Sequence, residues 1–137
     1  MSGRDLSGPA RRAIVAALLN DPGVAALVGG RVYDYVSAAP TYPFLRCTTA
    51  TVTPWEATGA VRGGSSLMQV DAFTKDYGRT VVEQLVAAVV VTLDETELDL
   101  DGATLLSLQW RQTRILDDPA DQSIAHGVVE FEVIAAQ

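Results

Sequence analysis

The chain has 137 residues, the length of one ordinary domain; 48% are hydrophobic and 20% charged, which excludes intrinsic disorder as its main state. The single cysteine excludes an internal disulfide. The net charge of -7 is concentrated in residues 81–137, which hold eleven acidic residues and two arginines, whereas residues 1–40 and 41–80 each have a balance of +1. An acidic chain without a Lys/Arg cluster lacks the surface that nucleic-acid-binding proteins use, so we do not expect DNA binding.

The start of the chain has no apolar leader segment, and its longest apolar stretch, residues 85–93 with Thr92 inside it, is far shorter than the ~20 residues that span a bilayer. We therefore expect a soluble, intracellular single domain over residues 1–137, with no membrane partner.

The first part of the chain carries signals for two helices. Ser7 is a candidate N-cap, Pro9 suits a first turn, and Ala10–Leu19 is rich in helix formers. Asp21 is a second candidate N-cap, for a short helix over Pro22–Val28 that ends at two glycines. A short extended piece is expected at residues 31–36.

The next region predicts two paired strands. Phe44–Val52 is rich in Thr and β-branched residues, and Ser66–Thr74 alternates between apolar and polar side chains. Residues 53–66 between them contain one proline and three glycines without periodicity, which predicts a long loop. Neighbouring strands usually pair, so we expect the two strands to form a hairpin.

A long helix is expected at Tyr77–Leu93, with Asp76 as its cap and an apolar stripe along one face. Residues 97–100 and 103–114 then predict a β-hairpin around an Asp-Gly turn, and Ile124–Ile134 predicts a last strand. Because the strands are grouped rather than alternating with helices, the fold class is α+β: a mostly antiparallel sheet with two N-terminal helices and one long helix packed on one face.

Two residues could form a catalytic dyad if the fold brings them together: Cys47, the only cysteine, and His126, the only histidine. The competing interpretation is that Cys47 packs as a small hydrophobe on the side of its strand shared with Leu45 and Thr49. His126 would then be an exposed or hydrogen-bonded residue at a sheet edge. The second interpretation is favoured, so we expect no catalytic residue and no enzyme.

Metal and phosphate sites are also not predicted. Residues 97–102 resemble the start of a calcium loop, but Leu108 stands where a bidentate glutamate is required. Asp117, Asp118 and Asp121 are expected to form a solvated turn. Neither glycine pair opens a helix, which disfavours a phosphate cradle. We therefore expect no metal and no cofactor.

The predicted loop at residues 53–66 holds the candidate protein–protein contact, formed by Trp55, Glu56 and Arg62. Trp55 is a large apolar residue without an evident core position, and aromatic residues of this kind are enriched at protein interfaces. The alternative is that Trp55 folds back over an open sheet edge.

Several short segments together resemble a known family. Leu27–Tyr33 (Leu-Val-Gly-Gly-Arg-Val-Tyr), followed by Pro40 and Tyr42-Pro43-Phe44, resembles the opening of tail-completion (tail terminator) proteins of long-tailed phages and gene transfer particles. The later order of strand, long helix and closing strand after His126 is similar as well. The resemblance implies an α+β subunit without catalytic residues. It also implies a typically hexameric ring that caps the tail tube and joins it to the head-side connector.

The same resemblance implies that the protein belongs to the neck of a virion assembled in the bacterial cytoplasm, and that DNA passes through the ring without specific binding. One alternative is a head-closure (stopper) protein on the other side of the joint. The alternative from another class is a small enzyme or ligand-binding domain that uses Cys47 and His126.

Overall fold

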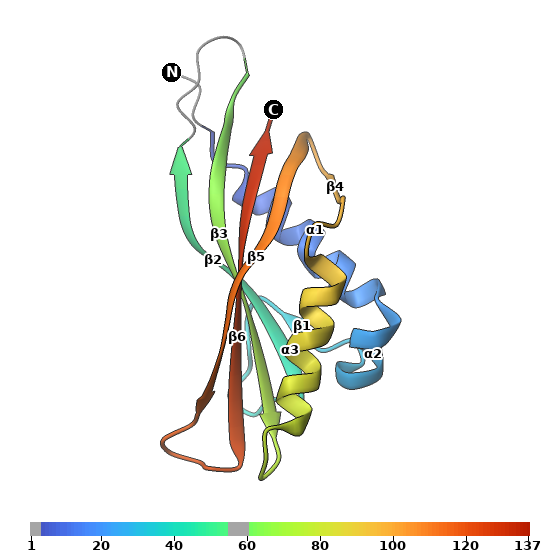
Figure 1. Cartoon of the computed structure of the whole chain (residues 1–137), viewed down its shortest axis with the longest axis vertical. Coiled ribbons are helices and arrows are strands. Elements are labelled where there is room, and N and C mark those ends of the chain that lie inside the picture. Colours follow the sequence, from blue (N-terminus) through green and yellow to red (C-terminus); the bar gives the residue numbers. More distant parts are fainter. Residues whose placement is uncertain (1–3, 55–60) are drawn as a thin grey trace.

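The structure is a computed structural model that describes residues 4–54 and 61–137. Helices and strands follow one another in the order α1 (Ser7–Asn20), α2 (Pro22–Val28), β1 (Val32–Tyr33), β2 (Phe44–Pro54), β3 (Gly63–Lys75), α3 (Thr80–Leu93), β4 (Asp99–Leu100), β5 (Ala103–Asp117) and β6 (Ile124–Ala136). Figure 1 shows the long strands twisting past one another, with α1, α2 and α3 together on one side of them.

The strands form one sheet in the order β1-β2-β3-β6-β5-β4. All neighbouring pairs are antiparallel except β1 and β2, which are parallel. The α+β prediction, with a mostly antiparallel sheet and three helices on one face, is confirmed. His126 lies in β6, between β3 and β5, so its predicted place at a sheet edge is wrong.

The helix starts divide into one correct and two incorrect predictions. The Asp21 carboxylate accepts a hydrogen bond of 2.9 Å from the Val24 N–H and caps α2 as predicted. Ser7 is not the cap of α1, because it lies inside the helix and donates its N–H and hydroxyl to Asp5. Asp76 does not cap α3, which begins three residues later than predicted, at Thr80, after Arg79 as N-cap.

The predicted hairpin of β2 and β3 is present and longer than expected. The ladder continues through the pairs Thr53–Ser65 and Pro54–Gly64, so strand occupies both ends of the loop predicted at 53–66. The loop prediction extended too far because threonine, serine and glycine residues give little periodic signal, whereas β3 pairs along its whole length with β6.

The core lies between the sheet and the helices. Its largest fully buried side chains come from α1, α3 and three strands: Ile14, Leu18, Leu45, Met68, Leu85, Leu93 and Phe131. Helix α3 lies close against β6 at Gly127, where an added Cβ would lie 2.5 Å from Val86 Cγ1. The absence of a side chain at Gly127 therefore allows the helix to approach the sheet.

Candidate interaction surfaces

The structure describes only one of the three residues of the predicted contact at the β2–β3 hairpin. Trp55 and Glu56 lie outside the described residues. Arg62 is exposed, and its backbone pairs with Gln137 near the C-terminus: Arg62 N–H donates to the Gln137 carbonyl at 3.3 Å, and Gln137 N–H donates back at 2.7 Å. The Arg62 side chain is therefore presented at the end of the sheet where β3 begins, and its role in a contact stays a prediction.

Cys47 and His126 lie on opposite faces of the sheet. Cys47 belongs to the core between the sheet and the helices, and its burial raises the pKa of the thiol from 9.0 to about 12. His126 pairs in register with Phe73, which faces away from the helices. The structure therefore does not bring the two residues of the candidate dyad together, and the thiol packs as a hydrophobe.

His126 instead joins a polar cluster on the open face of the sheet. Its Nε2 lies 2.7 Å from Asp71 Oδ1, and Gln69 Nε2 donates to both Asp71 oxygens at 3.0 and 3.2 Å. The Asp71 residue is only 5% exposed, so these bonds satisfy a buried carboxylate. The pair therefore links β3 to β6 through their side chains.

The Asp71–His126 pair was not found from the sequence. The alternation of β3 placed Gln69, Asp71 and Phe73 on one face, but only the register of β3 with β6 sets His126 beside them. Phe73 stacks between His126, at a centroid distance of 4.2 Å, and Phe44, at 4.9 Å. This aromatic row crosses β2, β3 and β6 and covers part of the open face.

The remainder of the open face carries ion pairs between β5 and β6. Arg114 Nη2 lies 3.4 Å from Glu130 Oε1, and Arg111 pairs with Glu132. Both arginine side chains are about half exposed, at 51% and 49%, so each pair contributes little to stability. The open face is thus charged with both signs.

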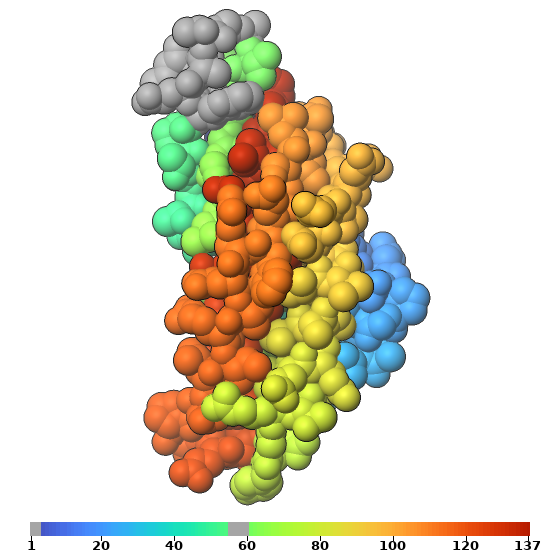
Figure 2. Space-filling model, in the orientation of Figure 1, coloured from blue at the N-terminus to red at the C-terminus, as the bar shows by residue number. Residues whose placement is uncertain are grey.

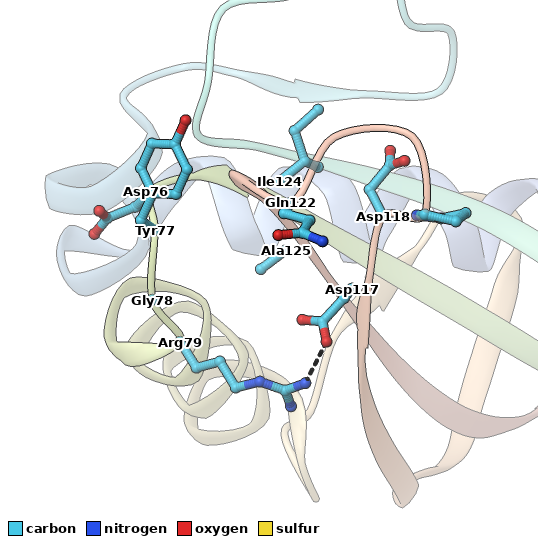
Figure 3. Close-up of a pocket in the computed structure, with 10 residues that line it drawn as sticks. Asp76, Tyr77, Gly78, Arg79, Asp117, Asp118, Gln122, Ile124 and Ala125 are labelled. Carbon is cyan, nitrogen blue, oxygen red and sulfur yellow. Dashed lines mark hydrogen bonds and ion pairs between the residues drawn. The ribbon is translucent and has the colours of Figure 1, made fainter.

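A shallow pocket lies between the β3–α3 turn and the β5–β6 turn (Figure 3). Its volume is about 390 Å³, and two of its lining residues, Arg79 and Asp117, form an ion pair with an Nη2–Oδ2 distance of 3.0 Å. The residues drawn around it include Asp76, Tyr77, Gly78, Asp118, Gln122, Ile124 and Ala125. Within residues 4–54 and 61–137, three or more possible metal ligands gather neither here nor elsewhere.

The acidic turn at residues 117–121 behaves as predicted. Asp118 Oδ1 accepts from the Ala120 N–H at 2.8 Å, and Asp121 Oδ1 accepts from the Ser123 N–H and hydroxyl at 2.9 and 2.6 Å. The hydrogen bonds from Ser123 lower the pKa of Asp121. These carboxylates therefore bind the backbone of their own turn. The calcium-like run also forms a strand and turn, with Gly102 at a φ of 74°.

An apolar groove runs between α3 and β5, in a region for which sequence reasoning assigned no role. Its lining residues are Val86, Ala87, Val90, Val91, Trp110 and Thr113. Val91 is 83% exposed and Trp110 is 45% exposed. We call this surface the α3–β5 groove. The signal that could have revealed it is Val91, which lies outside the apolar stripe of its helix.

The order of the elements and the surfaces just described agree with one family of proteins. The family model of the tail completion protein gp17 matches residues 12–136. The chain belongs to this family. The tail completion family consists of structural proteins of the phage tail, and the resemblance seen in the sequence is confirmed.

A solved structure supports the fold of the tail completion protein independently. A chain of the virion of a native gene transfer agent (GTA) particle matches it with a TM-score of 0.82 and 22% sequence identity, over 96% of this chain and 98% of that chain. At this identity the likeness shows a shared fold. No curated protein matches the sequence. Among residues 4–54 and 61–137, every helix is too short or too polar to span a bilayer.

Proposed function

We propose that the protein is a tail terminator. Copies of the chain associate into a ring, taken as a hexamer, that caps the finished tail tube and joins it to the head-side connector in the neck of the virion. Assembly takes place in the bacterial cytoplasm. The observation that carries the proposal is the match of the tail completion family over residues 12–136.

The chemistry of the chain supports a role in association instead of catalysis. The thiol of Cys47 is buried with a pKa raised to about 12, whereas a nucleophilic cysteine requires a lowered pKa and an accessible sulfur. His126 is held by a carboxylate on the other face of the sheet. We infer that the protein acts without a cofactor, through contacts with copies of itself and with neighbouring virion proteins.

The test is the mass of the purified protein, measured alone and after mixing with tail tubes. We expect a multiple of the 14.6 kDa chain, and we expect it to bind at one end of each tube. A ring that forms only on tubes fits the proposal equally well. A protein that binds the isolated head-side connector but not the tube would instead be a head-closure protein. Failure to bind either structure would contradict the proposal.

Trp55, with Glu56 and Arg62, is proposed as a contact with a neighbouring subunit, the tube or the connector. Trp55→Ala should impair ring assembly or tail joining while leaving the thermal unfolding of the monomer unchanged, because a contact residue contributes to binding and not to the core. Circular dichroism and sedimentation measure the two effects separately. Loss of the fold in this variant would show that the indole belongs to the core.

The acidic balance is proposed to assist DNA transit. Six copies would carry a formal charge of -42, six times the -7 of one chain, and like charges facing the passage would keep DNA from adhering. Reversing the exposed Asp99 and Asp101 to lysine should slow DNA delivery. The matched control compares the reversal of Asp99 alone with the reversal of Asp76 alone, which is also exposed. Unchanged delivery, or equal slowing by the control, would count against this role.

A further inference from the structure

The α3–β5 groove has the character of a docking surface. It is lined almost wholly by apolar side chains, and Val91 projects from α3 with 83% of its surface exposed. Trp110 lies on the neighbouring strand, held by a 3.0 Å hydrogen bond from its Nε1 to Thr113 Oγ1. A half-exposed tryptophan with a satisfied polar group, beside apolar helix residues, is the composition found at the centre of protein interfaces.

Two contacts occupy the edge of β5 where the groove begins. The Trp110 N–H donates to the Asp94 carboxylate at 2.9 Å, and the Glu95 N–H donates to the Leu108 carbonyl at 2.9 Å. Irregularities in the ladder with β6 follow Leu105 and Trp110. These features hinder strand pairing at Leu108 and Trp110, so a partner at this end of the groove docks through side chains.

Charge indicates what kind of surface the groove accepts. Residues 80–97, which form α3 and the turn after it, carry four acidic residues and no basic one. A contact between two identical grooves would bring these acidic segments together, which is unfavourable. The groove therefore favours an apolar surface that carries positive charge.

The outer side of α1 has this composition. Its exposed residues Arg12, Ala16 and Leu19 share one face of the helix, away from the buried row of Ala10, Ile14 and Leu18. The residues of α1 include two arginines and no acid. Leu19 is 41% exposed. The outer side of α1 is thus an apolar strip that carries one arginine, Arg12, whereas Arg11 pairs with Asp34 at 3.7 Å.

We propose that the α3–β5 groove of one copy receives the outer side of α1 from a second copy. Figure 2 shows the blue N-terminal helices and orange β5 on opposite sides of yellow α3, so one molecule can use both surfaces at once. A contact between two different surfaces continues from copy to copy and closes into a ring when the rotation permits. The inference rests on the proposed ring and names the surfaces that build it.

Two variants test the contact. Val91→Glu alters the groove and Leu19→Glu alters the α1 surface, and both side chains are exposed in the monomer. Each variant alone should associate about thirtyfold more weakly or worse, because each removes an interface centre. Gln84→Glu, an exposed change of the same charge on α3 outside the groove, should associate like the wild type.

Mixing the two variants gives the decisive result. Val91→Glu keeps its α1 surface and Leu19→Glu keeps its groove, so one molecule of each can form the contact. The two surfaces left over both carry glutamate and repel each other, so the mixture should form one-to-one pairs that grow no further. If Val91→Glu is the only variant that loses association, and mixing it with Leu19→Glu does not restore the association, then identical grooves pair with each other. If both variants form rings like the wild type, the inference is wrong, and the proposed capping of tubes is unaffected. If the wild type binds tubes only as a monomer, the contact does not exist.

Discussion

The buried thiol of Cys47 makes the stability of the fold depend on alkaline pH. Burial raises its pKa from 9.0 to about 12, so the unfolded chain loses the thiol proton first as the pH rises. The stabilisation is complete below pH 9.0 and is lost progressively as the pH approaches about 12. Within this window the unfolded chain binds one proton fewer, and the free energy of unfolding falls by about 1.4 kcal/mol per pH unit.

Urea denaturation of the wild type and of Cys47→Ala measures this dependence. Both chains share every other titrating group, so the difference between their unfolding free energies isolates the thiol. We expect that difference to shift by about 2 kcal/mol between pH 9 and about pH 10.5, in the direction that disfavours the wild type. In parallel, iodoacetamide should react with Cys47 far more slowly in the folded chain than in urea.

Equal pH slopes for the two chains would refute this reasoning, because they would mean that the thiol is not desolvated. Rapid alkylation of the folded protein at neutral pH would also refute it, because it would mean that the Cys47 sulfur is accessible and reactive. A reactive thiol would also restore the enzyme alternative that the opposite placement of Cys47 and His126 argues against.

Two further predictions concern packing. Gly127→Ala should destabilise the fold by ~1–3 kcal/mol, because the new Cβ would lie 2.5 Å from Val86 Cγ1. The control Gly30→Ala, whose new Cβ would have no atom within 4 Å, should cause no such loss in the same thermal melts. Equal effects of the two substitutions would contradict the close approach of α3 to the sheet. Thr74→Val should raise stability by about 1 kcal/mol, since the Thr74 hydroxyl is buried without a hydrogen-bond partner in the described part of the chain. If a denaturation experiment shows that Thr74→Val is less stable than the wild type, this hydroxyl has a hydrogen-bond partner.

Most of the fold could be predicted from periodicity and turn chemistry. Asp21 before a proline marked the start of α2, and the Asp-Gly turn marked the hairpin of β4 and β5, where Gly102 adopts a φ of 74°. The predicted boundaries of helices and strands were wrong where local sequence signals competed with long-range pairing. Asp76 is a good cap by residue type, but its backbone N–H donates to the Ser123 carbonyl at 2.7 Å, which ties it to the turn before β6.

The candidate surfaces were less predictable because they depend on register and on what the helices leave uncovered. A sequence shows that Asp71 and His126 can each face away from the core, but not that β3 and β6 place them 2.7 Å apart. Likewise, Val91 and Trp110 lie in elements that were both predicted, yet their juxtaposition follows only from the packing of α3 against β5.

The position of this protein in the particle tests its assignment as a tail terminator most directly. Electron cryomicroscopy of particles purified from the host that produces the chain should show a ring of this α+β subunit at the end of the tail tube nearest the head. The described residues, 4–54 and 61–137, provide the shape to be fitted. A neck and upper tail fully explained by other proteins, with no density for this polypeptide, would contradict the assignment.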